Sequence, residues 1–315
     1  MKVLWSLGVA CLLLLVTRVG AAQDAPPCPP AAQPLTAELF QAAAAQARDR
    51  GLLWRVTKGG HASYLYGTLH VGRAEWMAPG PMVQRALQET DTLALELDPL
   101  DEAVQRDMAA GMARAKAHPL PAALRSRLLQ ALQAQCLPTD TVNQAAPEML
   151  VYTLSTLVGR RDGLEPGYGS EILLSLLGHG SGRSVVSLET VALQLKTLLA
   201  HDAAEAETVV REGLDDLDSD RVHTVLLKSA RVWENGELAE LERYTQWCQC
   251  AETPLDKKLM RRLLDDRNPG LSKRIDQLHT QGQKLFVAVG AMHMTGAIGL
   301  PALLARRGYR VERVF

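Results

Sequence analysis

The 315-residue chain is 47% hydrophobic and has 34 basic and 35 acidic side chains, for a net charge of −1 at pH 7. This balance provides no basic excess, so nothing in it suggests nucleic acid or an anionic membrane surface as a partner, and we expect no nucleic acid to bind. The length suits one large domain or two small ones.

The first 22 residues have the pattern of a secretory signal peptide. Lys2 supplies a positive charge, residues 3–16 are apolar, and small residues at 20–22 fit a cleavage site. A membrane anchor is the alternative, but the apolar stretch is short for a span of roughly 20 residues. A lipoprotein signal at Cys11 fits less well, because the apolar run continues past it. We expect an exported protein, periplasmic or secreted, with no stable membrane anchor after cleavage.

The mature chain is expected to begin with a Pro/Ala-rich linker at 23–35, followed by one domain at 36–315. Its four cysteines are Cys28, Cys136, Cys248 and Cys250. Export favours two disulfides, which have three pairings, and we expect Cys136 to pair with Cys248 or Cys250. Zinc binding is the alternative, but Cys-x-Cys is not the usual Cys-x-x-Cys spacing.

Hydrophobic periodicity and turn residues predict the elements of this domain. The first part is predicted to be a helix, a hairpin, a helix and a strand, at 36–50, 52–57 with 62–69, 81–89 and 92–97. Residues 100–177 are helical, with breaks at prolines. Strands follow at 184–188, 285–289 and 309–314, with helices at 191–199, 203–249, 255–264, 271–281 and 299–307.

These elements predict an α/β (α+β) fold. A mixed central sheet of about six strands is flanked by helices, with a large helical insertion at about 100–180 and 203–282. In open α/β sheets, sites gather outside the carboxyl ends of strands, where helix N-termini also point. Polar side chains that follow strands are therefore the candidates for chemistry.

Two segments share an apolar strand followed by Gly-x-x-His, one from Gly67 to His70 and the other from Gly290 to His293. Two imidazoles that meet just past strand ends could share a metal ion. The two glycines would allow sharp turns and keep space open beside the ligands. The alternative is that both histidines only form hydrogen bonds at strand ends.

Two glutamates also follow strands. Glu96 lies among apolar residues, where a carboxylate is costly unless it is paired or binds a metal. The alternative is an exposed position on the polar face of the strand. Glu189 ends the strand at 184–188, and its alternative role is to cap the next helix. Gln194, five residues on, could help to hold that region.

Arg267 and Asn268 precede the helix predicted at 271–281. Arg267 could form a salt bridge, bind a substrate carboxylate or stabilise an oxyanion. Asn268 could cap the helix. Nothing in the local sequence decides between these roles.

The chain resembles the TraB/GumN family, which includes the animal Tiki proteases, from about Leu52 to the C-terminus. The matching segments are Leu53-Trp54-Arg55-Val56 with Tyr64 to His70, Leu188-Glu189-Thr190 followed by Gln194, Arg267-Asn268, and Gly290 to His293 with Gly299-Leu300 and Gly308 to Val311. The resemblance implies a Tiki-type fold related to erythromycin esterase and the ChaN-like proteins. It also implies a divalent-metal hydrolase site with His70, His293 and Glu96, and Glu189 as a further candidate.

The leading hypothesis is a metal-dependent hydrolase that acts as a peptidase in the bacterial cell envelope. His70, His293 and Glu96 would bind manganese, cobalt or zinc, while Glu96 or Glu189 acts as general base and Arg267 stabilises charge. A small-molecule hydrolase of the esterase type is the second enzyme hypothesis. Two hypotheses without catalysis are a periplasmic protein that binds a peptide or a metal-bound ligand, and a structural protein of the envelope.

Overall fold

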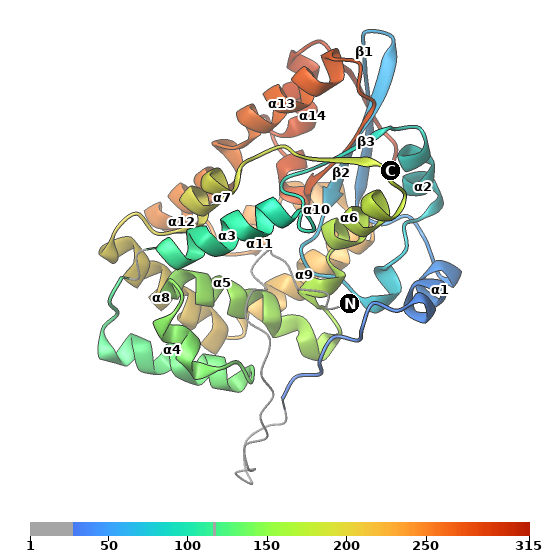
Figure 1. The fold of residues 1–315 in the computed structure, drawn as a ribbon. Helices are drawn as coiled ribbons and strands as arrows, with labels where there is room; N and C mark the ends of the chain where they lie inside the picture. Colours follow the sequence, from blue (N-terminus) through green and yellow to red (C-terminus); the bar gives the residue numbers. More distant parts are fainter. Residues whose placement is uncertain (1–27, 116–117) are drawn as a thin grey trace.

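Figure 1 shows the fold in a computed structural model, which describes residues 28–115 and 118–315. The predicted signal peptide lies outside the described residues. Within these ranges, six strands form one mixed sheet in the order β4-β3-β5-β2-β1-β6, which confirms the expected fold class. No helix in the same part of the chain is long and apolar enough to span a bilayer.

The strands are β1 (Leu52–Lys58), β2 (His61–Thr68), β3 (Thr92–Leu95), β4 (Ser184–Ser187), β5 (Leu285–Gly290) and β6 (Arg310–Arg313). β1 and β2 form the predicted antiparallel hairpin, and β6 pairs antiparallel with β1. Gly59 and Gly60 in the hairpin turn have φ of 62° and 84°. Glycine adopts this left-handed conformation without strain, which explains the Gly-Gly pair.

Strands β4, β3, β5 and β2 run parallel to one another. Phe286 and Val287 in β5 are fully buried. A strand covered on both faces needs apolar side chains at consecutive positions, which explains the unbroken apolar run in β5. The parallel arrangement places four carboxyl ends at one edge of the sheet.

The helices between and beyond the strands are α1 (Ala37–Ala45), α2 (Pro81–Gln88), α3 (Glu102–Arg114), α4 (Ala122–Ala134), α5 (Pro147–Leu157), α6 (Ser170–Gly180), α7 (Val191–Leu198), α8 (Ala203–Asp218), α9 (Arg221–Glu234), α10 (Leu238–Glu242), α11 (Tyr244–Trp247), α12 (Pro254–Met260), α13 (Asn268–Thr280) and α14 (Leu300–Arg306). α6 packs on β3 and β4, α13 packs on β5, and α14 packs on β6. Their apolar residues and those of the strands form the main core.

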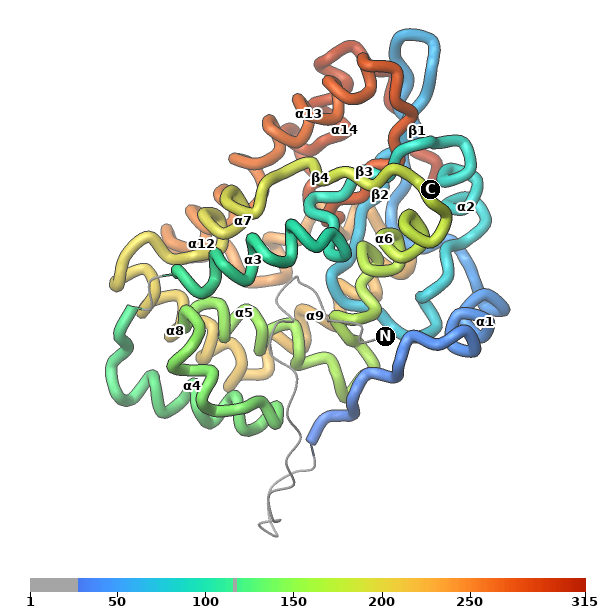
Figure 2. The backbone as a smooth tube through the Cα atoms, viewed as in Figure 1, coloured from blue at the N-terminus to red at the C-terminus, as the bar shows by residue number. Residues whose placement is uncertain are grey.

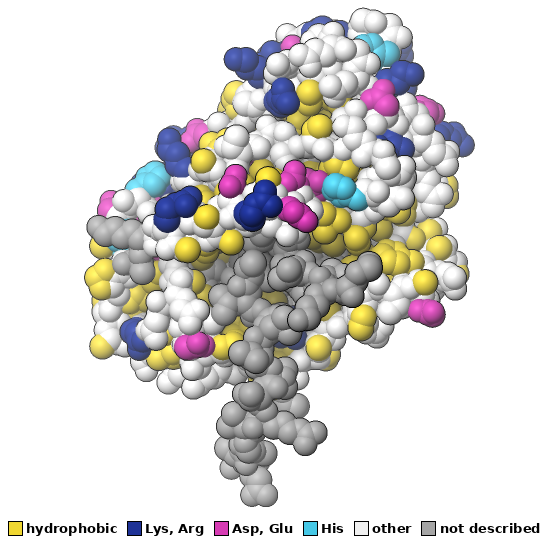
Figure 3. All heavy atoms as spheres, viewed as in Figure 1, with side chains coloured by type: hydrophobic (Ala, Val, Ile, Leu, Met, Phe, Trp, Pro, Cys, Tyr) yellow, Lys and Arg dark blue, Asp and Glu magenta, His cyan; other side chains and the backbone are white. Residues whose placement is uncertain are grey.

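Helices α4, α5 and α8 form a second apolar cluster around Leu128, Leu154 and Val210. Figure 2 shows these helices together at the end of the molecule away from the hairpin. On the face drawn in Figure 3, Lys and Arg side chains are interspersed with Asp and Glu. Helices α4, α5 and α8 therefore have an apolar core of their own, whereas α6, α9 and α13 of the same predicted insertion pack into the main core.

The predicted disulfide pairing is wrong. The structure pairs Cys28 with Cys136 and Cys248 with Cys250. Cys136 lies just past α4. The segment after Cys28 is also held by a hydrogen bond from Arg160 to the Pro30 carbonyl oxygen. Cys248 and Cys250 follow α11, where Gln249 has φ of 55° and turns the chain so that its neighbours meet.

Several predicted boundaries also differ from the structure. The first helix ends at Ala45 instead of Arg50, and β3 ends at Leu95, so Glu96 lies just beyond the strand. α13 begins at Asn268 instead of Leu271, because Pro269 is tolerated in the first helical turn, where its missing N–H group is not needed.

Candidate functional site

The four strand-end residues singled out in the sequence lie at one edge of the sheet. Glu189 follows β4, Glu96 follows β3, His293 follows β5 and His70 follows β2. These strands are neighbours in that order and run parallel, so residues far apart in the sequence come together.

His70 lies two residues beyond β2, and its side chain is 65% exposed. Its Nδ1 atom is 2.5 Å from Oε1 of Glu171 in the first turn of α6. The negative charge of Glu171 raises the pKa of His70 to about 9, so the imidazole is protonated at neutral pH.

His293 lies in a short 3-10 turn after β5 and is 3% exposed. Its Nδ1 atom is 2.6 Å from Oδ1 of Asn268. Because an amide oxygen only accepts, Nδ1 donates and Nε2 keeps its lone pair. Burial lowers the pKa of His293 to about 4, so this imidazole is neutral at neutral pH.

Gly290 faces a space bordered by three of these side chains. A methyl group on Gly290 would lie 3.4 Å from Glu96 Oε1, 3.6 Å from His293 Cδ2 and 3.7 Å from His70 Nε2. The three atoms are therefore separated from one another by at most about 7 Å, and Glu96 Oε1 lies 3.9 Å from Nε2 of His293. The backbone N–H of Gly290 also donates to Glu96 Oε1 at 2.8 Å, which fixes that carboxylate.

Arg267 lies between the two glutamates. Its Nε donates to Glu189 Oε1 at 3.0 Å, and its Nη2 donates to oxygens of both Glu189 and Glu96. Its Nη1 lies 3.3 Å from His293 Nε2. Of the roles left open, the structure gives Arg267 the salt bridge, and it occupies the unprotonated side of the His293 ring.

Neighbouring charges decide the ionisation of Glu96. Burial alone would raise its pKa, but His293, Arg267 and His70 outweigh that effect and lower it to about 2. Burial would lower the pKa of Arg267, and the carboxylates of Glu189 and Glu96 reverse this and raise it. A buried cluster of fixed charges results, held by hydrogen bonds.

The supporting residues have separate roles. Gln194 Nε2 donates to Glu189 Oε2 at 3.3 Å and lies 3.5 Å from Glu96 Oε2. Asn268 orients His293 instead of capping a helix. A Cβ atom on Gly67 would lie 3.0 Å from Cα of Ala291, so glycine allows the two Gly-x-x-His segments to pack closely.

Sequence reasoning missed Glu171. It lies 101 residues from His70, in the first turn of α6. Acidic residues are common in the first turn because they stabilise the positive end of the helix dipole, so Glu171 gave no sign of a functional role. Its Oε1 holds His70, while its Oε2 is buried without a hydrogen-bond partner among the described residues. Only the fold shows that the N-terminus of α6 lies beside the end of β2.

The side chains at this edge of the sheet include donor types that divalent metal ions use. The Nδ1 atom of each imidazole is hydrogen-bonded to an oxygen, of Glu171 for His70 and of Asn268 for His293. Metal-binding histidines are commonly oriented by such a hydrogen bond on the nitrogen that does not bind the metal. The space beside Gly290 is open to Nε2 of His70 and to Glu96 Oε1. In this structure the residues are not arranged to bind a metal ion. Arg267 contacts His293 Nε2, and no group of three or more His, Cys, Asp or Glu in the described chain is placed so that it could hold a metal ion.

The comparisons with known proteins agree with the sequence resemblance. A model of the TraB/PrgY/gumN family matches residues 52–313, which is most of the chain and includes every strand and strand-end residue described above. No curated protein and no solved structure matches the chain. On this match, the chain belongs to the TraB/PrgY/gumN family.

Proposed function

We propose that this protein is a metal-dependent hydrolase that acts as a peptidase in the bacterial cell envelope. The observation that supports it is the space beside Gly290, where His70 Nε2, Glu96 Oε1 and the His293 ring meet. His70, His293 and Glu96 would hold the ion, which is manganese, cobalt or zinc in this proposal. Lewis-acid polarisation of a scissile carbonyl and of water is the chemistry that such an ion supplies when bound.

The protein's own residues would then act around that centre. Glu171 and Asn268 hold the two rings with Nε2 available, once His70 has lost its proton and Arg267 Nη1 has left His293. Glu189 keeps Arg267 beside Glu96 through two hydrogen bonds. Arg267 would stabilise negative charge on a reacting carbonyl oxygen, and Glu96 or Glu189 would accept a proton from water.

The test measures metal content and peptide hydrolysis together. Wild type, His70→Ala, His293→Ala and a control, His201→Ala, are incubated with a mixed peptide library and added manganese, cobalt or zinc. We expect wild type and the control to bind metal and to cleave peptides, and both site variants to lose metal and activity. Unchanged metal uptake and cleavage in both site variants would end the proposal.

The contact between Arg267 and His293 favours a second candidate, a hydrolase of small-molecule esters that uses no metal. His70 and Glu171 would form a histidine–carboxylate pair for proton transfer, with the high pKa of His70 suiting a general acid. Hydrolysis of simple esters that survives a chelator but is lost in His70→Ala would favour this candidate. A protein that binds its ligand without catalysis would show no turnover in either assay.

A further inference from the structure

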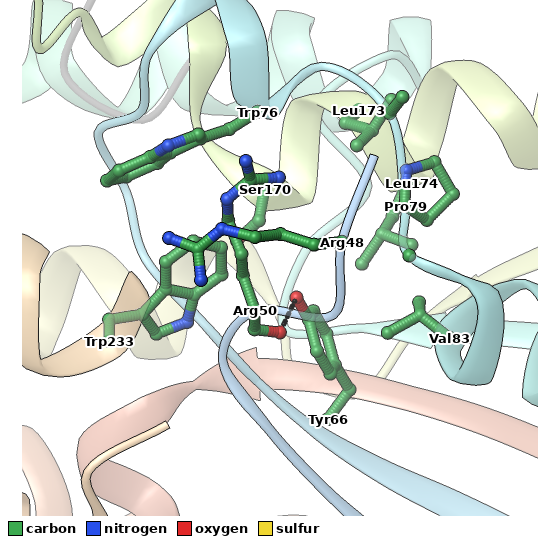
Figure 4. A pocket seen from close by; sticks show the side chains of 12 residues that line it. Arg48, Arg50, Tyr66, Trp76, Pro79, Val83, Ser170, Leu173, Leu174 and Trp233 are labelled. Carbon is green, nitrogen blue, oxygen red and sulfur yellow. Dashed lines mark hydrogen bonds between the residues drawn. The ribbon is translucent and has the colours of Figure 1, made fainter. Parts of the chain in front are cut away.

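A pocket separate from the strand-end residues lies where the segment after α1 passes β2, α6 and α9 (Figure 4). The enclosed cavity is about 20 Å³, room for about one water molecule or the end of a carboxylate group, and it opens into a hollow of about 320 Å³ that includes open solvent. The polar and aromatic residues that line it are Arg48, Arg50, Tyr66, Trp76, Ser170 and Trp233. Apolar residues of α2 and α6, such as Val83 and Leu173, complete the lining.

Arg50 is the unusual member of this lining. The residue is 7% exposed, and its Nε and Nη1 atoms are buried without a hydrogen-bond partner among residues 28–115 and 118–315. The neighbouring carboxylate oxygen, Glu234 Oε1, lies 3.8 Å from Nε, too far for a hydrogen bond. Trp76 Nε1 is likewise buried and unpartnered within the described chain. Buried donors of this kind are costly unless something accepts from them.

The charges around the pocket are partly balanced, because the carboxylates of Glu234 and Glu75 both act on Arg50. Arg48 forms a 2.6 Å ion pair with Glu234, which takes up that carboxylate. Figure 4 shows the side chains of Arg48 and Arg50 next to each other, in the space between Trp76 and Trp233. Nε and Nη1 of Arg50 are the groups that lack an acceptor, and a negatively charged occupant would offset the repulsion between Arg50 and Arg48.

The shape of the lining narrows the kind of anion. The Arg50 guanidinium lies 6.0 Å from the centre of the Trp76 ring. Trp233 already uses its indole N–H on the carbonyl oxygen of Gly67, so its ring offers only an apolar surface. A carboxylate supplies two coplanar acceptor oxygens for a guanidinium, and its carbon skeleton can contact aromatic and aliphatic walls.

We propose that this pocket binds a small carboxylate anion, which accepts hydrogen bonds from the free N–H groups of Arg50 and Trp76. The site is independent of the proposed hydrolase chemistry, because neither residue contacts the strand-end cluster. The ligand would nevertheless lie close to it. Ser170 immediately precedes Glu171, and Trp233 holds Gly67 of the first Gly-x-x-His segment.

The experiment follows thermal unfolding and tryptophan fluorescence of the full chain as acetate or propionate replaces chloride at constant ionic strength. Neutral acetamide is the control ligand, and Arg55→Gln is the matched control variant, since Arg55 is an exposed arginine on β1. We expect a saturable rise of the unfolding midpoint with both acids. Affinity should fall at least tenfold in Arg50→Gln and stay unchanged in Arg55→Gln. Trp76→Phe, which keeps an aromatic ring and loses the N–H, should also weaken binding.

Two results would overturn the proposal. One is an equal response to acetamide. The other is no saturable response to either acid in folded wild-type protein, in which case water alone serves Arg50. The source of the carboxylate is settled by a short peptide with a free C-terminus and its C-terminal amide. If the peptide with a free C-terminus competes with acetate and its amide does not, the ligand is the C-terminus of a peptide. If neither peptide competes, the ligand is a free organic acid. Both outcomes keep the carboxylate site.

Discussion

The two Gly-x-x-His segments have one pattern and opposite environments. His70 is exposed, pairs with the carboxylate of Glu171 and has its pKa raised to about 9. His293 is buried, pairs with the neutral amide of Asn268 and has its pKa lowered to about 4. The motif therefore places the ring, and residues outside the motif decide its charge.

The largest expected effect comes from removing the cation beside His293. Arg267→Met leaves Glu96 and Glu189 buried without their partner, so we expect a loss of about 3–5 kcal/mol in the free energy of unfolding, the range for a broken buried ion pair. Urea unfolding at pH 7 measures it, and Arg55→Met on the exposed face of β1 is the control. A loss no larger than that of the control would mean that the cluster contributes nothing to stability.

Asn268, the partner of His293, should contribute more to the free energy of unfolding than Glu171, the partner of His70. Asn268→Leu removes the acceptor of a buried N–H, so we expect a loss of about 1–3 kcal/mol. Glu171→Gln alters an ion pair whose histidine is largely exposed, so its loss should stay below about 1 kcal/mol. Urea unfolding of both variants under identical conditions makes the comparison, and the reverse order would contradict it.

The fold was predictable to a large extent, because apolar runs and turn residues mark strands locally. The strand-end rule also brought His70, Glu96, Glu189 and His293 together. Glu171 and the Cys28–Cys136 disulfide were not predictable, since each depends on how helices pack on distant segments. The Cys248–Cys250 disulfide depends instead on the left-handed turn at Gln249. The salt bridge of Arg267 was one of several open roles, because its partners lie 78 and 171 residues away in the chain.

The two histidines should also respond oppositely to pH. Because the pKa of His70 is raised above 6.5, its contribution to stability is full below pH 6.5 and is lost as pH rises through about 9. The pKa of His293 is lowered, so the folded state binds fewer protons than the unfolded state, and stability falls as pH drops from 6.5 towards 4. Nuclear magnetic resonance titration of the imidazole signals in metal-free protein, with His70→Gln and His293→Gln for assignment, checks both values. Two ordinary titrations near pH 6.5 would refute the contrast.

The smallest effect on stability is expected at the glycine between the rings. Gly290 has φ of −47° and ψ of 135°, which alanine can adopt, so Gly290→Ala should change the free energy of unfolding by less than about 1 kcal/mol. Its methyl group would nevertheless enter the space shared by Glu96 and both histidines and weaken metal binding. Gly180→Ala, where a Cβ meets nothing within 4 Å, is the control. Calorimetry with zinc or manganese should separate the two variants, and equal affinities would show that the space is not used.

The most direct measurement is a double-mutant cycle on metal binding, with wild type, His70→Ala, His293→Ala and the double variant titrated with zinc or manganese. If both rings bind one ion, each single change removes most of the affinity and the double variant is hardly weaker than either single one. Losses that add up, or a single variant that binds as tightly as wild type, would show that the two Gly-x-x-His segments do not share a site.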